Sequence, residues 1–188
     1  MLRSKEIGPA GVVAASAGNH AQGVALAASQ AGLPATIVMP HWASISKQQS
    51  TRGYGGEVVL EGATIEESLK KAREMARRGM TFIHPFDDGD IITGQGTIAL
   101  EILDAEPDID VIVVPVGGGG LISGIAAAAK SIKSDIQVVG VQASNCPSSA
   151  ASLKAGRVTE VKSLSSIADG ISVKRPGKVT FGMIRNLV

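Results

Sequence analysis

The stretch V-I-V-V-P-V-G-G-G-G-L-I-S-G, residues 111–124, decides the fold class. Its first half, Val111 to Val116, is a continuous apolar run, which predicts a strand buried on both faces of a parallel sheet. An Ala-rich segment follows and predicts a helix at residues 121–131. Four consecutive glycines, Gly117 to Gly120, separate the two. Glycine loses much conformational freedom on folding, so this run indicates unusual backbone dihedral angles or a very close approach to a neighbouring group.

Strand and helix patterns alternate on both sides of this stretch. Short apolar runs predict further strands at residues 11–15, 35–39, 57–60, 80–83 and 136–141. Helical patterns fall at residues 21–31, 44–51, 64–78, 93–105, 149–155 and 179–188, and Thr64 with Glu67 forms a capping box at one helix start. Helices between buried strands require right-handed crossovers, so the sequence predicts an α/β fold with doubly wound parallel sheets. A turn-rich stretch at residues 84–89 divides it into a small α/β domain, 1–88, and part of a second domain, 89–188.

Composition excludes several classes of protein. The chain has 188 residues, 44% of them hydrophobic, and a formal net charge of +1, so it is neither disordered nor equipped with a basic surface for nucleic acid. No apolar run approaches the length of a membrane span, and no targeting signal is recognised. The single Cys146 cannot close an intrachain disulfide. We therefore expect a cytoplasmic protein without nucleic-acid or membrane partners.

The glycine run is the first candidate site. It follows a buried strand and opens a helix, and bare backbone N–H groups at a helix start form a cradle for phosphate. No Gly-Lys-Ser/Thr follows, so the run is not a P-loop. The sequence therefore predicts a phosphate held by the backbone of Gly117 to Leu121 alone. The other interpretation, a tight strand-to-helix turn, needs only one or two glycines.

A second strand-to-helix loop, S-A-G-N-H-A-Q-G at residues 16–23, is the other candidate. Ser16 and Asn19 offer hydroxyl and amide hydrogen bonds, Gly18 frees the backbone, and the helix dipole favours an anion. An ordinary N-cap explains the same residues equally well, since Ser, Asn and Gly are the preferred capping residues.

Other motifs are weaker. G-Q-G-T-I-A at residues 94–99 satisfies a relaxed dinucleotide fingerprint, so a nicotinamide-dependent dehydrogenase stays open and predicts a strand ending just before Gly94. His41 and His84 lack the partners of a zinc site, and Cys146 is interpreted as a buried small side chain. Asp87 and Asp88 are interpreted as turn residues.

Four motifs taken in order carry a family resemblance. They are S-A-G-N-H-A-Q-G at 16–23, G-Q-G-T-I-A-L-E-I at 94–102, V-P-V-G-G-G-G-L-I-S-G at 114–124 and I-A-D-G at 167–170. Together they closely resemble the threonine dehydratase (threonine/serine ammonia-lyase) family, pyridoxal-phosphate enzymes of the tryptophan-synthase-β fold type. The resemblance implies pyridoxal 5'-phosphate as cofactor, with its phosphate on Gly117, Gly118, Gly119, Gly120 and Leu121 and its ring hydroxyl on Asn19. It places Ser16, Ala17, Gly18 and His20 in the loop that receives the substrate carboxylate.

The resemblance also implies a reaction and an assembly. L-threonine or L-serine loses its α-proton and β-hydroxyl, and the product hydrolyses to a 2-oxo acid and ammonia. Related serine racemases carry a serine where Ala17 stands, so alanine favours elimination, with a serine racemase-like enzyme as a lesser alternative. A homo-oligomer, dimer or tetramer, is implied, and a catabolic and an isoleucine-biosynthetic role stay open.

The chain departs from the family in three places. The S-F-K-x-R-G-A-like segment with the Schiff-base lysine is absent, and Lys5 is expected near the amino end of the first strand, about 16 Å from the carboxyl end where Ser16 lies. The C-terminal serine or cysteine that faces the pyridine nitrogen is also missing. We therefore expect an internal fragment without its own catalytic lysine and with little or no activity; a non-catalytic phosphate-ligand-binding or subunit-interaction protein is the alternative. Ser165 and Ser166 replace a glutamate that some relatives use for a cation, so no metal is expected.

Overall fold

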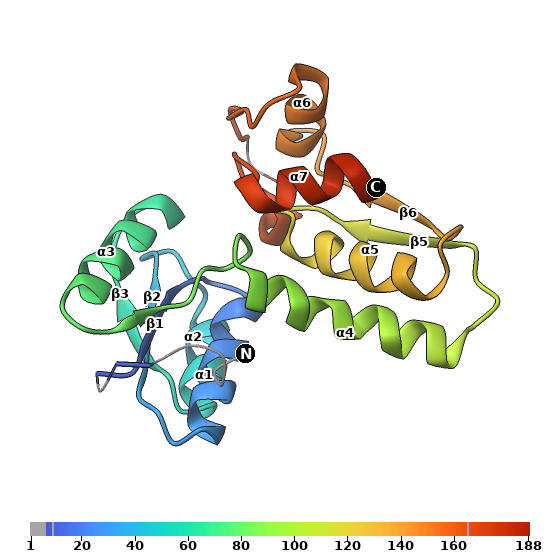
Figure 1. Cartoon of the computed structure of the whole chain (residues 1–188). Coiled ribbons are helices and arrows are strands. Elements are labelled where there is room, and N and C mark those ends of the chain that lie inside the picture. Colours follow the sequence, from blue (N-terminus) through green and yellow to red (C-terminus); the bar gives the residue numbers. More distant parts are fainter. Residues whose placement is uncertain (1–6, 9, 165) are drawn as a thin grey trace. The chain divides into compact units, whose positions relative to one another are not determined.

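The computed structural model describes residues 7–8, 10–164 and 166–188, and Lys5 and Ser165 lie outside this part. The chain divides into two compact units, residues 1–85 and 86–188, which are described separately (Figure 1). Asp87 and Asp88 belong to the second unit. Within the described part, no helix is both long and apolar enough to cross a membrane.

Unit 1 is built on a four-stranded parallel sheet in the order β3-β2-β1-β4. Its strands are β1 (Val12–Ala15), β2 (Ala35–Met39), β3 (Glu57–Leu60) and β4 (Thr81–Phe82). Val12 of β1 pairs with Ala35 on one side and with Thr81 on the other. Every residue of β1 and β2 is buried, as the continuous apolar runs predict for the centre of a parallel sheet.

In the described part of this unit, the helices that accompany the sheet are α1 (Asn19–Gln30), α2 (Ile45–Gly53) and α3 (Ile65–Arg77). Val13, Ala15 and Val38 pack against Ala72 of α3. Because side chains alternate along a strand, Val12 faces the other side, where α1 contacts β1 and β2 (Figure 1). The sheet is therefore covered on both faces, which is the doubly wound arrangement.

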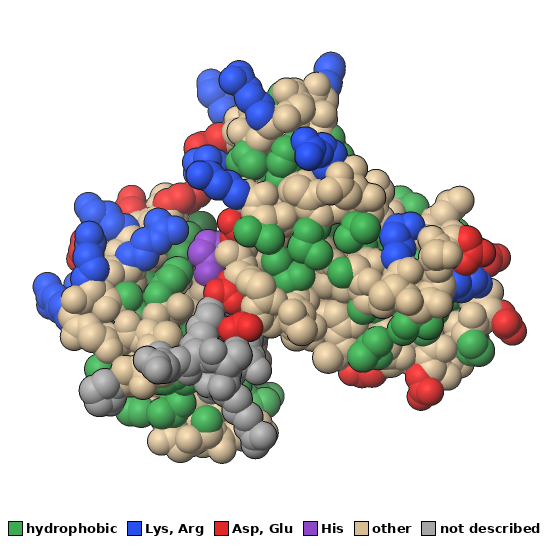
Figure 2. Space-filling model, in the orientation of Figure 1, with side chains coloured by type: hydrophobic (Ala, Val, Ile, Leu, Met, Phe, Trp, Pro, Cys, Tyr) green, Lys and Arg blue, Asp and Glu red, His purple; other side chains and the backbone are tan. Residues whose placement is uncertain are grey.

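Helix α3 shows how its local sequence sets its boundaries. The Thr64 side chain accepts a hydrogen bond from the Glu67 backbone N–H at 3.2 Å, as the capping box predicts. The Glu67 carboxylate accepts from the Ala63 N–H at 2.7 Å, one residue before the expected partner. Lys and Arg side chains gather over the outer face of α3 (Figure 2), around a shallow hollow of about 410 Å³ lined by Lys70, Arg73, Ala76 and Arg77.

The order of the strands reverses between β1 and β4. The chain runs from β1 through β2 to β3 on one side, and α3 then returns it to β4 on the other side of β1. Ligands of open α/β sheets bind beyond the carboxyl ends of strands at such a reversal. The loop that follows Ala15 starts at this point.

The described residues of unit 2 form a two-stranded parallel sheet and four α-helices. Strand β5 (Val111–Pro115) pairs with β6 (Gln137–Val141), and α5 (Gly120–Ile132) connects them. The other helices are α4 (Gly89–Ala105), α6 (Ser148–Ala155) and α7 (Lys178–Leu187), with a 3₁₀ turn, η1, at Asp169–Ile171. The core lies where α5 packs on the sheet, with Ile122 and Ala126 against Val114 and Val138.

The expectation that the strands of this sheet are buried on both faces is wrong. Side chains alternate between buried and exposed along β5, and Val113 is 63% exposed. Helix α5 covers the face that carries Ile112 and Val114, and the alternate residues Val111 and Val113 face solvent. An apolar run without alternation is thus compatible with burial of one face only.

Helices α4 and α5 cross at very short range. A Cβ atom on Gly124 of α5 would overlap the Ile92 carbonyl oxygen and lie 2.7 Å from the Gly96 backbone nitrogen of α4. A Cβ atom on Gly96 would lie 3.1 Å from the Gly124 carbonyl oxygen. Two glycines therefore permit backbone to contact backbone at this crossing.

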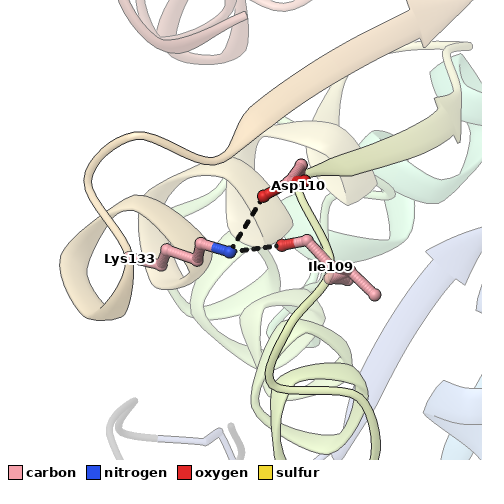
Figure 3. Close-up of polar contacts among 3 residues, drawn as sticks. All are labelled: Ile109, Asp110 and Lys133. Carbon is pink, nitrogen blue, oxygen red and sulfur yellow. Dashed lines mark hydrogen bonds and ion pairs between the residues drawn. The ribbon is translucent and has the colours of Figure 1, made fainter.

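A lysine fixes the end of α5 to the segment that enters the sheet (Figure 3). The Lys133 ammonium donates to the Ile109 carbonyl oxygen at 2.8 Å and lies 3.2 Å from the Asp110 carboxylate. The Asp110 side chain is 86% exposed and that of Lys133 is 26% exposed. Solvent screens the ion pair strongly, so the bond to the carbonyl is the more stabilising contact.

Candidate functional site

The loop after β1 is held in shape by a bond to β2 and by the hydroxyl of its own Ser16. The Ser16 N–H donates to the Val38 carbonyl oxygen at 3.1 Å, which continues the pairing of β1 with β2 beyond the strand. The Ser16 hydroxyl oxygen accepts a hydrogen bond from the Gly18 N–H at 3.1 Å. Ser16, Ala17 and Gly18 are half-buried, whereas Asn19 is exposed. The loop is therefore ordered but open to a ligand.

Helix α1 begins without a side-chain cap. Its N-cap residue is Gly18, no side chain accepts a hydrogen bond at the cap, and the first turn contains no acidic residue. The N-cap interpretation is thus met by Gly18, while no side-chain hydrogen bond caps the helix. The first N–H groups of a helix carry a partial positive charge and need acceptors, so this end of α1 suits a carboxylate or phosphate.

His20 connects α1 to the neighbouring strand. Its Nε2 atom lies 3.4 Å from the carbonyl oxygen of Ile83, the residue after β4. The contact thus bridges the two strands at which the sheet order reverses. Asn19 borders a shallow hollow of about 260 Å³ together with Gln22, Gly23, Leu26 and Tyr54.

The glycine loop, which is the run Gly117 to Gly120, occupies the equivalent position in unit 2 after β5. It starts where the Val116 N–H donates to the Val141 carbonyl oxygen at 2.8 Å, and it ends at the first turn of α5. The N-cap residue Gly119 has a φ of 98°, in the left-handed region that favours glycine, and no side chain caps the helix. Among the described residues, none accepts a hydrogen bond from the N–H groups of residues 117–121.

The space that side chains would occupy at these glycines is filled by the protein itself. A Cβ atom on Gly118 would overlap the Phe86 ring, and one on Gly120 would lie 2.9 Å from the Phe86 Cα atom. A Cβ atom on Gly117 would lie 3.2 Å from the Cα atom of Ile171. The glycines therefore let the loop rest on its neighbours, while no described residue accepts from its N–H groups. Buried backbone donors require an acceptor, and a phosphate group fits this donor set.

The dinucleotide-like motif at residues 94–99 is not a nucleotide site. All six residues lie inside α4, which begins at Gly89, four residues before the predicted start. The residue before Gly94 is helical, so the strand that a dehydrogenase requires is absent from this described segment. Gly96 instead serves the crossing of α4 with α5. The dehydrogenase hypothesis is therefore wrong.

His41, His84 and Cys146 make contacts or have burial that fit a structural role. The His41 N–H donates to the Gly62 carbonyl oxygen at 2.9 Å, and the His84 ring meets the Phe82 ring edge-on at 5.9 Å. Cys146 is fully buried, in agreement with its interpretation as a small core side chain.

Asp87 and Asp88 do more than form a turn. The Asp88 carboxylate caps α4 by accepting from the Asp90 and Ile91 N–H groups at 3.0 and 3.3 Å. The Asp87 carboxylate accepts from the first N–H groups of α7, 91 to 93 residues away in sequence. Local sequence shows the first cap, because Asp precedes a helical pattern, but gives no signal for the second.

The residues proposed for the site fall on both units. Ser16, Ala17, Gly18, Asn19 and His20 belong to one loop of unit 1, and residues 117–121 belong to unit 2. Each loop follows a parallel strand and opens a helix with no side-chain cap. Their individual roles toward cofactor and substrate, and the absence of a metal, remain predictions.

Comparison with known proteins identifies relatives over nearly the whole chain. The family described as "Pyridoxal-phosphate dependent enzyme" matches residues 1–188. An L-threonine ammonia-lyase from Thermotoga maritima is 53% identical over 186 residues, which are 98% of this chain and 46% of that protein. A processed threonine deaminase isoform 2 from Solanum lycopersicum has a TM-score of 0.90 at 41% identity, covering 96% of this chain and 50% of its own. Maize serine racemase has a TM-score of 0.89 at 40% identity, covering 94% and 54%. The chain thus spans about half the length of these relatives.

Proposed function

Because the chain belongs to the family of pyridoxal-phosphate dependent enzymes, we propose that it forms the cofactor-phosphate loop and the substrate loop of a threonine/serine ammonia-lyase. The proposed reaction converts L-threonine, or L-serine, to a 2-oxo acid and ammonia. The observation that carries the proposal is the row of N–H groups at residues 117–121, unpartnered in the described chain and placed between β5 and α5. Threonine ammonia-lyase and threonine deaminase relatives support the choice of substrate.

Five residues of unit 2 are proposed to hold the cofactor phosphate. The backbone N–H groups of Gly117, Gly118, Gly119, Gly120 and Leu121 supply the hydrogen bonds, and the positive end of α5 supplies favourable charge. The Asn19 side chain, exposed at the start of α1, is proposed to bond the ring hydroxyl. When bound, pyridoxal 5'-phosphate supplies an electron sink for the substrate α-carbon.

The loop after β1 is proposed to bind the substrate carboxylate. The start of α1 offers N–H donors without a competing side-chain cap, and Ser16 holds the loop through its bond to the Gly18 N–H. His20 steadies the loop through its contact with Ile83. A carboxylate bound here orients the α-carbon, and correct orientation alone removes much of the entropic cost of reaction.

Ala17 supports elimination over racemisation. Racemisation requires a group that delivers a proton to the second face of the α-carbon, and the methyl side chain of Ala17 can neither donate nor accept one. The likeness to maize serine racemase makes a racemase the second candidate function, and it requires a different residue to deliver that proton. We further propose that the protein is cytoplasmic, acts on a small amino acid and forms a homo-oligomer. Light scattering on the purified protein measures its molar mass and so the number of subunits.

The proposal is tested in a chimera. The segment of the Thermotoga maritima L-threonine ammonia-lyase that matches this chain is replaced by the matching 186 residues of this chain, and formation of 2-oxobutyrate from L-threonine is measured. We expect turnover within about tenfold of the parent enzyme, since half of the aligned residues are identical. A chimera that folds and binds pyridoxal phosphate but does not deaminate threonine or serine contradicts the proposal.

Matched variants of the chimera separate the two candidate activities. The A17S variant introduces a hydroxyl at position 17 of the loop. With L-serine as substrate, it is expected to form more D-serine relative to pyruvate than the unmodified chimera does. The A17G variant, which has no hydroxyl, serves as its control. Predominant racemisation by the unmodified chimera favours the second candidate. The 188-residue chain alone, with added pyridoxal phosphate, is expected to give little or no 2-oxobutyrate. If the chimera also binds pyridoxal phosphate without turning over threonine or serine, a non-catalytic phosphate-binding protein is favoured.

A further inference from the structure

The start of α7 is occupied by a carboxylate from a distant part of unit 2. Asp87 Oδ2 accepts a hydrogen bond from the Lys178 N–H at 2.9 Å, and Asp87 Oδ1 accepts from the Val179 and Thr180 N–H groups at 2.9 and 3.2 Å. The N-cap residue Gly177 has no side chain, and a Cβ atom there would overlap the Asp87 carboxylate. The positive end of α7 is therefore neutralised from within the chain.

The same helix start holds the glycine loop. The fully buried Thr180 hydroxyl donates to the Gly118 carbonyl oxygen at 2.7 Å, and the Gly177 N–H donates to the same oxygen at 3.2 Å. The Ser123 hydroxyl of α5 donates to the Thr180 carbonyl oxygen at 3.4 Å. The loop peptide is thus bound to α7 by two hydrogen bonds, and α7 is bound back to α5.

These bonds determine where the next N–H group points. In a trans peptide the carbonyl and the following N–H point in opposite directions. Since the Gly118 carbonyl points to Thr180, the Gly119 N–H points away from α7. Gly119 has no side chain to resist rotation of this peptide, so its orientation depends on the bonds to α7.

We infer that Asp87 and Thr180 are positioning residues that hold the Gly118–Gly119 peptide with its N–H toward the bound cofactor phosphate. The inference rests on the proposed function, in which residues 117–121 bind that phosphate. Asp87 fixes the first turn of α7, and Thr180 in that turn fixes the Gly118 carbonyl through its hydrogen bond. Because the start of α7 is already capped by Asp87, the uncapped start of α5 is the end that binds the anion. Neither residue touches the phosphate.

The test compares phosphate binding by variants of the 188-residue chain. Inorganic phosphate and pyridoxal 5'-phosphate are titrated into ¹⁵N-labelled protein, and the amide signals of residues 117–121 are followed. We expect T180V, which keeps the shape but loses the hydroxyl, to weaken both affinities about five- to tenfold, the effect of one hydrogen bond. T180S retains the hydroxyl and is expected to stay within about twofold. D87N is also expected to lower both affinities, as T180V does, because its amide group presents N–H donors to the N–H groups of α7.

A matched control separates positioning from general stability. Ser152 is also fully buried, and its hydroxyl donates to the Ser148 carbonyl oxygen at 2.7 Å and accepts from the Thr159 N–H at 2.9 Å, so neither of these two bonds involves residues 117–121. S152A is expected to lower the urea midpoint as T180V does but to leave phosphate affinity unchanged.

Three outcomes overturn the inference. Equal affinities of T180V and the unmodified chain overturn it while leaving the proposed function intact. Equal losses in T180V and S152A also overturn it, since the effect then follows stability alone. If phosphate shifts none of the amide signals of residues 117–121 in the unmodified chain, the inference and the proposed phosphate site both fail.

Discussion

Replacing Gly124 by alanine should destabilise unit 2 strongly, although alanine is the better helix former. The added methyl group would overlap the Ile92 carbonyl oxygen and lie 2.7 Å from the Gly96 nitrogen, and both are backbone atoms of α4. Because backbone cannot turn aside as a flexible side chain can, the two helices must separate. Overpacking of this kind costs about 3 kcal/mol, and the higher helix propensity of alanine returns about 1 kcal/mol. We expect the free energy of unfolding to fall by about 2 kcal/mol.

A glycine of α4 that lies outside the crossing provides the control. Gly94 lies two residues before Gly96 in α4, and a Cβ atom there meets nothing within 4 Å. G94A is therefore expected to raise the free energy of unfolding by roughly 0.5–1 kcal/mol through helix propensity alone. The two substitutions are chemically identical, so their opposite effects isolate the packing term.

Thermal unfolding followed by circular dichroism at 222 nm measures both variants. A loss of about 2 kcal/mol in a unit of this size lowers Tm by roughly 10 °C. Fluorescence of Trp42, the single tryptophan, reports on unit 1 and shows whether the change is confined to unit 2. A G124A protein as stable as the unmodified chain, or one more stable, would refute the close crossing of α4 and α5.

Two further substitutions test contacts at the ends of helices. D88A removes the cap of α4 and should lower the free energy of unfolding by about 1 kcal/mol, with D88N nearer to the unmodified chain; equal urea midpoints for D88A and the unmodified chain would argue against the cap. K133M loses the bond to the Ile109 carbonyl and should cost about 1 kcal/mol, whereas D110N removes only the exposed partner and should cost less than about 0.5 kcal/mol. Urea denaturation measures both, and a D110N loss larger than that of K133M would contradict the order of these contacts.

Long-range contacts explain most of the differences between expectation and structure. The G-Q-G-T-I-A motif has the spacing of a nucleotide loop, yet its second glycine, Gly96, serves a helix crossing with a partner 28 residues away. The exposed face of β5 depends on which helices reach that sheet. The bond from Asp87 to α7 spans more than 90 residues. Each of these contacts depends on where a distant segment of the chain packs, and neighbouring residues in the sequence do not predict that packing.

The sequence by itself determined the features that arise from neighbouring residues. Apolar runs and helical periodicity defined the alternation of strands and helices, and the motifs at residues 16–23 and 114–124 marked the two strand-to-helix loops. Local steric and hydrogen-bonding preferences control these features, so a short segment carries the information. Only the tertiary structure decided that the ends of α1 and α5 lack side-chain caps, that Asp87 caps α7, and that the Thr180 hydroxyl donates to the Gly118 carbonyl oxygen. These depend on atoms that meet only when the chain is folded.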